Sequence, residues 1–211
     1  KKIMIDLQLN SKTDLKREGK SFYWASFFLP KSSKINAGIL YSICRYFDDI
    51  ADKSNVDKTN YLKYTIEEIK NNKRNEINIF LEKNKINNLI FIDLIEGLIL
   101  DQRKTRIQNQ EELIKYSYHV AGTVGLMMSK IIGVNHEKAT QSAIDLGIGM
   151  QLTNIARDVH EDSKMKRIYL PANWIPNITL DNLNYPNELS LEKKVIISNA
   201  IDKVINLSEK F

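Results

Sequence analysis

The chain has 211 residues and a formal net charge of +5; 43% of its residues are hydrophobic and 27% are charged. These values are typical of a soluble globular protein of one domain, and they exclude a disordered or fibrous chain. The single cysteine, Cys44, excludes an internal disulfide framework. The longest apolar run falls short of the ~18 residues that a spanning helix needs, and Asp6 stands where a signal peptide would need an apolar stretch. We therefore expect a cytoplasmic protein.

The positive charge carries little information about partners. Lysines are scattered among many asparagines and isoleucines, which is as consistent with a biased base composition of the gene as with an anionic partner. The sequence contains no zinc-ligand spacing, RNA-binding motif or stripe of basic and aromatic residues. We therefore expect no nucleic-acid partner.

The positions of the prolines predict an all-α fold in a single domain, residues 1–211. No proline occurs within residues 31–170, and a proline inside a helix costs ~3 kcal/mol, so this stretch permits long helices. Apolar residues recur there at helical spacing, as in Leu62, Ile66 and Ile69. Residues 163–189 hold three prolines and predict a loop. The predicted helices cover residues 20–29, 32–53, 57–71, 74–83, 87–104, 110–133, 137–162 and 190–210.

A first acidic motif lies in the predicted helix at residues 32–53. At ~100° per residue, one stripe about 60° wide holds four polar side chains, namely those of Tyr41, Arg45, Asp48 and Asp52. The opposite face is apolar. Two aspartates one turn apart repel each other by a few tenths of a kcal/mol unless a cation lies nearby.

A second acidic motif repeats this arrangement near residue 158. A stripe about 80° wide holds Gln151, Asn154, Asp158 and Asp162, and Arg157 lies beside it. Either motif alone is weak evidence for a metal, because aspartate pairs are common on solvated helix faces. Together they indicate a site for Mg²⁺, which prefers carboxylate ligands and completes its coordination with water and phosphate oxygens. Such a site suits the ionisation of an allylic diphosphate.

A stripe of small residues separates the two motifs. Tyr118, Gly122, Gly125 and Ser129 align on one face, and glycine inside a helix costs ~1 kcal/mol relative to alanine. One explanation is close packing between helices. The other is a groove for a long apolar chain, lined also by Val120, Val124, Met127 and Met128. The nearby diphosphate site favours the groove.

Five segments together resemble the squalene/phytoene synthases, which are head-to-head prenyl transferases. The resemblance is carried by GKSFYWASFFLP (19–30), YSICRYFDDIAD (41–52), DLIEGLILDQ (93–102), YSYHVAGTVGLMM (116–128) and QLTNIARDVHEDSKMKRIYLPANW (151–174). The sequences of the last three segments are most similar to those of bacterial phytoene synthases. The fold implied is the all-α isoprenoid synthase helical bundle with a central cavity.

The resemblance also implies roles for individual residues. Metal ligands would be Asp48, Asp52, Asn154, Asp158 and Asp162. The substrate diphosphates would be contacted by Lys20, Ser21, Tyr41, Arg45, Gln151, Asn154 and Arg157. The catalytic set would be the four aspartates with Arg45 and Arg157. Arg167 and Tyr169, in the loop after the second motif, would close over the diphosphate.

The reaction implied joins two geranylgeranyl diphosphates through a cyclopropylcarbinyl diphosphate to phytoene, a step of carotenoid biosynthesis. It requires Mg²⁺, or Mn²⁺ in its place, and no NADPH. Two alternatives stay open: a synthase that makes presqualene diphosphate, squalene or dehydrosqualene from farnesyl diphosphate, and a non-catalytic assembly factor. A hydrocarbon product is compatible with peripheral contact at the inner face of the membrane, and the sequence indicates no oligomeric state.

Two departures from the family pattern stand out. Lys166 occupies a position where the family commonly has glycine, so we expect a stiffer or differently routed loop there. Family members also continue with further helices beyond the point that corresponds to Phe211. We therefore expect this chain to be a partial isoprenoid synthase domain, truncated at its C-terminus.

Overall fold

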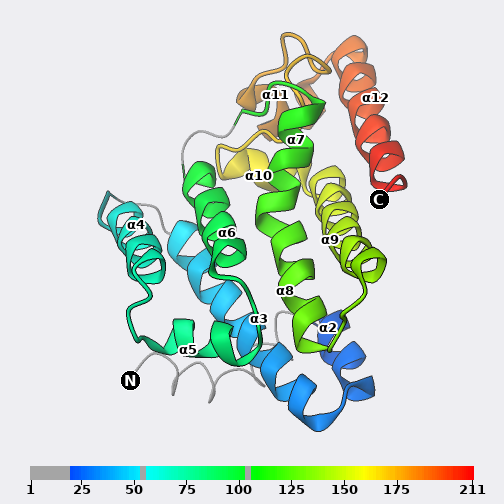
Figure 1. Ribbon diagram of the computed structural model, residues 1–211. Coiled ribbons are helices and arrows are strands. Elements are labelled where there is room, and N and C mark those ends of the chain that lie inside the picture. Colours follow the sequence, from blue (N-terminus) through cyan, green and yellow to red (C-terminus); the bar gives the residue numbers. More distant parts are fainter. Residues whose placement is uncertain (1–19, 53–55, 103–105) are drawn as a thin grey trace.

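The computed structural model describes residues 20–52, 56–102 and 106–211 as a helical bundle (Figure 1). Apart from helices, the described residues form one isolated bridge, between Arg106 and Ile168. The expected all-α fold is therefore confirmed for these residues. The elements are α2 (Lys20–Ala25), the 3₁₀ turn η1 (Ser26–Phe28), α3 (Lys31–Asp52), α4 (Val56–Lys70), α5 (Glu76–Lys83), α6 (Asn88–Asp101), α7 (Gln110–Ser117), the π-helical η2 (Tyr118–Gly122), α8 (Thr123–Ile131), α9 (Glu137–Arg157), α10 (Val159–Lys164), α11 (Leu180–Asn184), the 3₁₀ turn η3 (Pro186–Glu188) and α12 (Leu191–Ser208).

Short polar side chains fix where several helices begin. Asn75 accepts a hydrogen bond from the backbone N–H of Asn78, and Asn109 does the same for Glu112. Such caps satisfy backbone donors that have no partner within the helix, and each contributes ~1 kcal/mol. The asparagine-rich composition therefore defines helix ends as well as loops.

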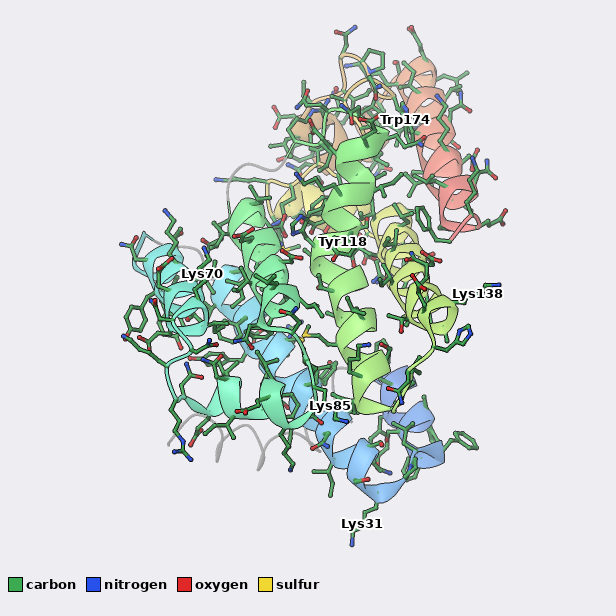
Figure 2. All side chains as sticks on the ribbon, in the orientation of Figure 1. Lys31, Lys70, Lys85, Tyr118, Lys138 and Trp174 are labelled. Carbon is green, nitrogen blue, oxygen red and sulfur yellow. The ribbon has the colours of Figure 1, made fainter. Side chains whose placement is uncertain are left out.

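One long rod runs through the middle of the bundle. Helices α7, η2 and α8 follow one another without a break, with α6 packed on one side and α9 on the other (Figure 1). Helix α12 packs against the outer side of α9, and α3 packs against both α6 and α8. Figure 2 places Tyr118 near the middle of this central rod.

The buried apolar side chains form two clusters, one on each side of the rod. The first joins α3 to α6 and α8 around Phe47 and Phe91. The second joins α7 and α9 to α12 and to the segment after α10, around Leu152 and Leu170. The rod contributes to both, with Leu113 in the second cluster and Met127 in the first. The two acidic motifs therefore sit on helices that belong to different cores.

The glycines of the small-residue stripe lie at the contact between the rod and α9. A Cβ atom at Gly125 would clash with the carbonyl oxygen of Ala143 on α9, and one at Gly147, which lies on α9, would clash with that of Ala121 on the rod. Close packing of two helices explains these glycines, and the expected groove is wrong for them. It is also wrong for Met127, which is fully buried in the first core.

Two predicted segments differ from the structure. The helix expected over residues 137–162 is broken at Asp158, whose φ and ψ of −101° and 18° separate α9 from α10. The loop expected over residues 163–189 contains α11, which starts at a capping box formed by Thr179 and Asn182. The three prolines of this segment had predicted a loop throughout, so the short helix was not expected. Along the part of the chain that the structure describes, no helix is long and apolar enough to span a membrane.

Candidate active site

The first motif lies along the last two turns of α3. Leu40, Ile43 and Phe47 are buried, which turns the polar stripe of the helix away from the first core. Within that stripe, Arg45 forms ion pairs of 3.1 Å to Asp48 and 3.0 Å to Asp49. The predicted division into an apolar and a polar face is confirmed, and the arginine already neutralises part of the acidic cluster.

The second motif straddles the break between α9 and α10. Arg157 donates two hydrogen bonds of 2.6 Å, from Nε and Nη2, to the two carboxylate oxygens of Asp158. The backbone N–H of Asp162, in α10, donates to the carbonyl of Asp158 at 2.8 Å. A bidentate arginine–carboxylate pair has a defined geometry, so Asp158 is held by its own sequence neighbour.

Arg167 brings the two motifs together. Its Nη2 donates to Oδ1 of Asp52 at 2.9 Å across 115 positions of sequence, while its backbone N–H donates to the carbonyl of Asp162 at 3.0 Å. The Arg167 side chain is only 12% exposed. Arg167 and Asp162 together line a small pocket. The other residues that line this pocket are Ile155, Val159, Ile168, Tyr169, Leu170 and Leu183. The guanidinium thus pairs with a carboxylate of the first motif, and its positive charge acts to lower the pKa of Asp162 in the second motif.

The residue before Arg167 has an unusual backbone conformation. Lys166 has φ of +63°, in the left-handed region, and its N–H donates to the carbonyl of Ser163 at 2.9 Å as α10 ends. Glycine adopts this conformation most easily. The lysine is therefore accommodated at some cost in strain, and a glycine would fit this backbone more easily.

Asp101, at the end of α6, is a buried carboxylate that the sequence analysis did not assign to the site. It is 8% exposed. The Tyr169 hydroxyl donates to both of its oxygens, at 2.6 and 2.7 Å, and the Tyr116 hydroxyl donates at 3.2 Å. Arg167 approaches it at 3.7 Å through Nη1. The available signal was an aspartate at the end of a predominantly apolar helix.

Burial and a neighbouring carboxylate raise the pKa of one aspartate in each motif. Burial and the neighbouring charge of Asp52 raise the pKa of Asp48 to about 6. Burial and the charge of Asp158 raise the pKa of Asp162 to about 7. Arg167 acts in the opposite direction on both. The site is therefore strongly anionic, and a further cation would be stabilised there.

In residues 20–52, 56–102 and 106–211, no three carboxylate, histidine or cysteine side chains gather closely enough to hold a metal ion. Asp48, Asp52 and Asp158 are each directed towards an arginine instead. The donor chemistry nevertheless fits Mg²⁺, because it consists of carboxylate oxygens whose mutual repulsion a divalent cation would relieve. The metal-ligand assignment therefore stays a prediction.

The other predicted substrate contacts divide into two groups. Tyr41 lies on α3, and Gln151 and Asn154 lie on α9, all half-buried and on the helices that carry the motifs. Lys20 and Ser21 begin α2, but their side chains lie outside the described part of the structure. For these five residues a role at the site stays a prediction.

Comparison with known proteins identifies close sequence relatives. The sequence pattern described as squalene/phytoene synthase matches residues 15–209. A 15-cis-phytoene synthase of Enterobacter agglomerans is 30% identical over 91% of this chain and 70% of its own length. A phytoene synthase of Pseudescherichia vulneris is 38% identical over 57% of this chain. The chain spans 38% of the length of that second relative.

Solved structures show the same architecture. A dehydrosqualene synthase in complex with a ligand superposes with a TM-score of 0.79 at 26% identity, over 97% of this chain and 75% of that one. A squalene synthase from Alicyclobacillus acidocaldarius superposes with a TM-score of 0.75 at 18% identity, over 96% of this chain and 82% of that one, which shows the shared fold.

Proposed function

The chain belongs to the squalene/phytoene synthase family, and on that basis we propose that it is a Mg²⁺-dependent prenyl transferase that joins two geranylgeranyl diphosphates head to head to form phytoene. The choice of a C20 substrate is supported by relatives named phytoene synthase at 30–38% identity. The phytoene product would need no NADPH.

The observation that carries the proposal is the position of Arg167. Its side chain contacts Asp52 of the first motif and lines a pocket with Asp162 of the second. A diphosphate is recognised by directed N–H donors together with metal-bridging carboxylates. Both the N–H donors and the carboxylates would lie at one location, although the two motifs are more than 100 residues apart in the sequence.

We assign the metal to the aspartates and the anion to the arginines. Asp48, Asp52, Asn154, Asp158 and Asp162 would hold Mg²⁺, which when bound would neutralise the charge of the departing diphosphate. The guanidinium groups of Arg45, Arg157 and Arg167 would turn from carboxylate partners to diphosphate oxygens. Lys20, Ser21, Tyr41 and Gln151 would contribute further contacts.

The reaction also requires that water be kept from the carbocation. Ionisation of one substrate would release diphosphate and give an allylic cation, which the double bond of the second substrate attacks. Loss of a proton would close the ring of the cyclopropylcarbinyl diphosphate. This intermediate would release its diphosphate, rearrange and lose a second proton to give phytoene. The apolar side chains that surround Arg167, such as Ile155 and Leu170, exclude water beside the charged groups. A water-insoluble product would leave at a membrane surface, which the protein would touch peripherally.

The direct test is incubation of the purified protein with Mg²⁺ and either the C20 or the C15 diphosphate, with and without NADPH. We expect a C40 hydrocarbon from the C20 substrate without NADPH. Products from the C15 substrate alone would assign the chain to the dehydrosqualene or squalene branch, as in the solved dehydrosqualene synthase. No product from either substrate would favour a non-catalytic assembly factor.

A further inference from the structure

A hydrogen-bonded cluster connects four separate parts of the chain behind the two aspartate motifs. Asp101 ends α6, Tyr116 lies on α7, and Arg167 and Tyr169 follow α10. The two tyrosines and Arg167 all approach the Asp101 carboxylate, and Arg167 reaches on to Asp52 at the end of α3. The cluster lies at the point where α3, α6, α7 and the segment after α10 come together.

A carboxylate as buried as Asp101 needs partners. Removing an unpaired charge from water costs several kcal/mol, which hydrogen bonds and an opposite charge must offset. The Tyr169 hydroxyl lies 2.6 and 2.7 Å from the two carboxylate oxygens, so its one proton is shared between them. Burial, with the neighbouring Tyr116 and Asp101, raises the pKa of Tyr169 far above its usual range, so its hydroxyl remains a donor. Arg167 supplies the positive charge.

The same contacts fix the backbone that carries Arg167. The Tyr169 ring stacks on Tyr116 with ring centres 4.8 Å apart and an interplanar angle of 20°. The carbonyl of Ile168 accepts a hydrogen bond of 3.3 Å from the N–H of Ile107. Arg167 is two residues from Tyr169, so its backbone is held by Asp101 through the tyrosine, and its guanidinium is held by Asp101 directly.

We infer that Asp101 is a positioning residue, which acts through Arg167 by holding its guanidinium between the two aspartate motifs, where an anionic diphosphate would bind. The identity of the anion rests on the proposed function. Asp101 itself would not contact the substrate, because Tyr116 and Tyr169 cover its oxygens.

The test is a double-mutant cycle between Asp101 and Arg167. Binding of inorganic diphosphate in the presence of Mg²⁺ is measured by isothermal titration for the intact protein, Asp101→Asn, Arg167→Gln and the double variant. We expect each single variant to bind about 10-fold more weakly, as when the support of a site residue is removed. The double variant should be within about twofold of Arg167→Gln, because the two changes remove one interaction. Independent effects that multiply to about 100-fold would overturn the inference, as would unchanged binding by Asp101→Asn.

Asp93 provides a matched control on the same helix. Its carboxylate accepts a hydrogen bond from Tyr118, whereas the ion pairs that Arg167 forms among the described residues are with Asp52 and Asp101. Asp93→Asn should leave diphosphate binding within about twofold of the original protein. If it weakens binding as much as Asp101→Asn does, the effect belongs to α6 as a whole and the inference is wrong.

A second variant covers the case in which Asp101→Asn does not fold. Tyr169→Phe keeps the ring that stacks on Tyr116 and removes only the hydroxyl that reaches Asp101. Its cycle with Arg167→Gln should show the same lack of additivity, and additive effects there would also refute the inference. Circular dichroism confirms that each variant is folded.

The outcomes separate this inference from the proposed function. If the protein binds diphosphate with coupling between Asp101 and Arg167 but makes no C40 product, the proposed function fails and the positioning role stands. If it makes the C40 product but the two residues act independently, the positioning role fails and the proposed function stands.

Discussion

The aspartate motif on α3 and the one at the end of α9 have the same spacing in the sequence but different backbones. Helix α3 runs unbroken to Asp52, so Asp48 and Asp52 lie one helical turn apart. Helix α9 stops at Arg157, and Asp158 stands between two helices with φ and ψ of −101° and 18°. This region of backbone space is sparsely populated and often contains active-site residues.

The two motifs therefore hold the same kinds of side chain in different ways. Asp48 faces Arg45, which lies one turn earlier on the same helix, whereas Asp158 faces the adjacent Arg157. Aspartate disfavours helix interiors because its side chain competes for backbone hydrogen bonds. The first motif is held by its helix, and the second depends on the contacts that hold α9 and α10 in place.

The largest expected effect comes from removing one carboxylate from each motif. Asp48→Asn and Asp158→Asn should each lower the rate of C40 formation by about 1,000-fold, since several kcal/mol of charge stabilisation would be lost. Rates are measured with the C20 diphosphate at saturating Mg²⁺. Turnover that survives in one variant only would mean that the two motifs are not equivalent. Asp145→Asn, more than three turns before Asp158 along α9, serves as the control.

A smaller effect should follow from separating α9 from the central rod. Gly125→Ala would place a Cβ atom against the backbone of Ala143, and we expect a loss of about 3 kcal/mol in the free energy of unfolding. Gly149→Ala is a milder control, because its Cβ would lie 3.2 Å from the nearest atom, the Ser208 carbonyl oxygen. Urea denaturation measures both. Equal losses would argue against close packing as the reason for Gly125.

Mg²⁺ together with inorganic diphosphate should stabilise the protein by about 1.4 kcal/mol at tenfold the dissociation constant. The effect should shrink as pH falls from 8 to 5, because Asp48 and Asp162 bind protons with pKa values of about 6 and 7.

Without metal, the stability of the protein depends on pH in the opposite direction. Both pKa values are raised in the folded state, so folding takes up protons between about pH 4 and pH 7, and these two groups contribute more stability as pH falls through that window. Thermal unfolding followed at several pH values measures both effects, with NaCl at equal ionic strength as the control. A metal effect as large at pH 5 as at pH 8 would rule out these carboxylates as ligands.

The smallest effect concerns the turn that leads from the second motif to Arg167. Lys166→Gly should relieve about 1 kcal/mol of left-handed strain but increase the entropy of the unfolded chain, for a net gain of about 0.5 kcal/mol. Chemical denaturation measures the change. Lys164→Gly, at the last residue of α10, should instead destabilise the protein slightly. A loss of stability in Lys166→Gly would show that the lysine side chain contributes to the turn.

Local patterns predicted the helices and the apolar face of α3, because helical spacing and proline positions act within a few residues. The break at Asp158 and the position of Arg167 beside Asp52 could not be predicted, since both depend on contacts between distant segments. The glycines of the small-residue stripe are a feature that the sequence showed but could not explain. Their alignment was visible, but packing and a groove leave the same pattern in a sequence, and only the distance to Ala143 separates them.

The π-helical turn at Tyr118–Gly122 has a consequence for insertions and deletions. Before it, the rod places Leu113 in the second core; after it, the rod places Met127 in the first. Because a π turn takes one residue more than an α-helical turn to cover nearly the same rotation, deleting one residue there would restore the ordinary helical pitch and leave the downstream side chains in place. Deleting one residue in α7 would instead rotate everything downstream by about 100°. Met127 would then leave its core, and Gly125 would turn away from α9. We therefore expect the π-helical turn to tolerate a one-residue deletion that α7 does not.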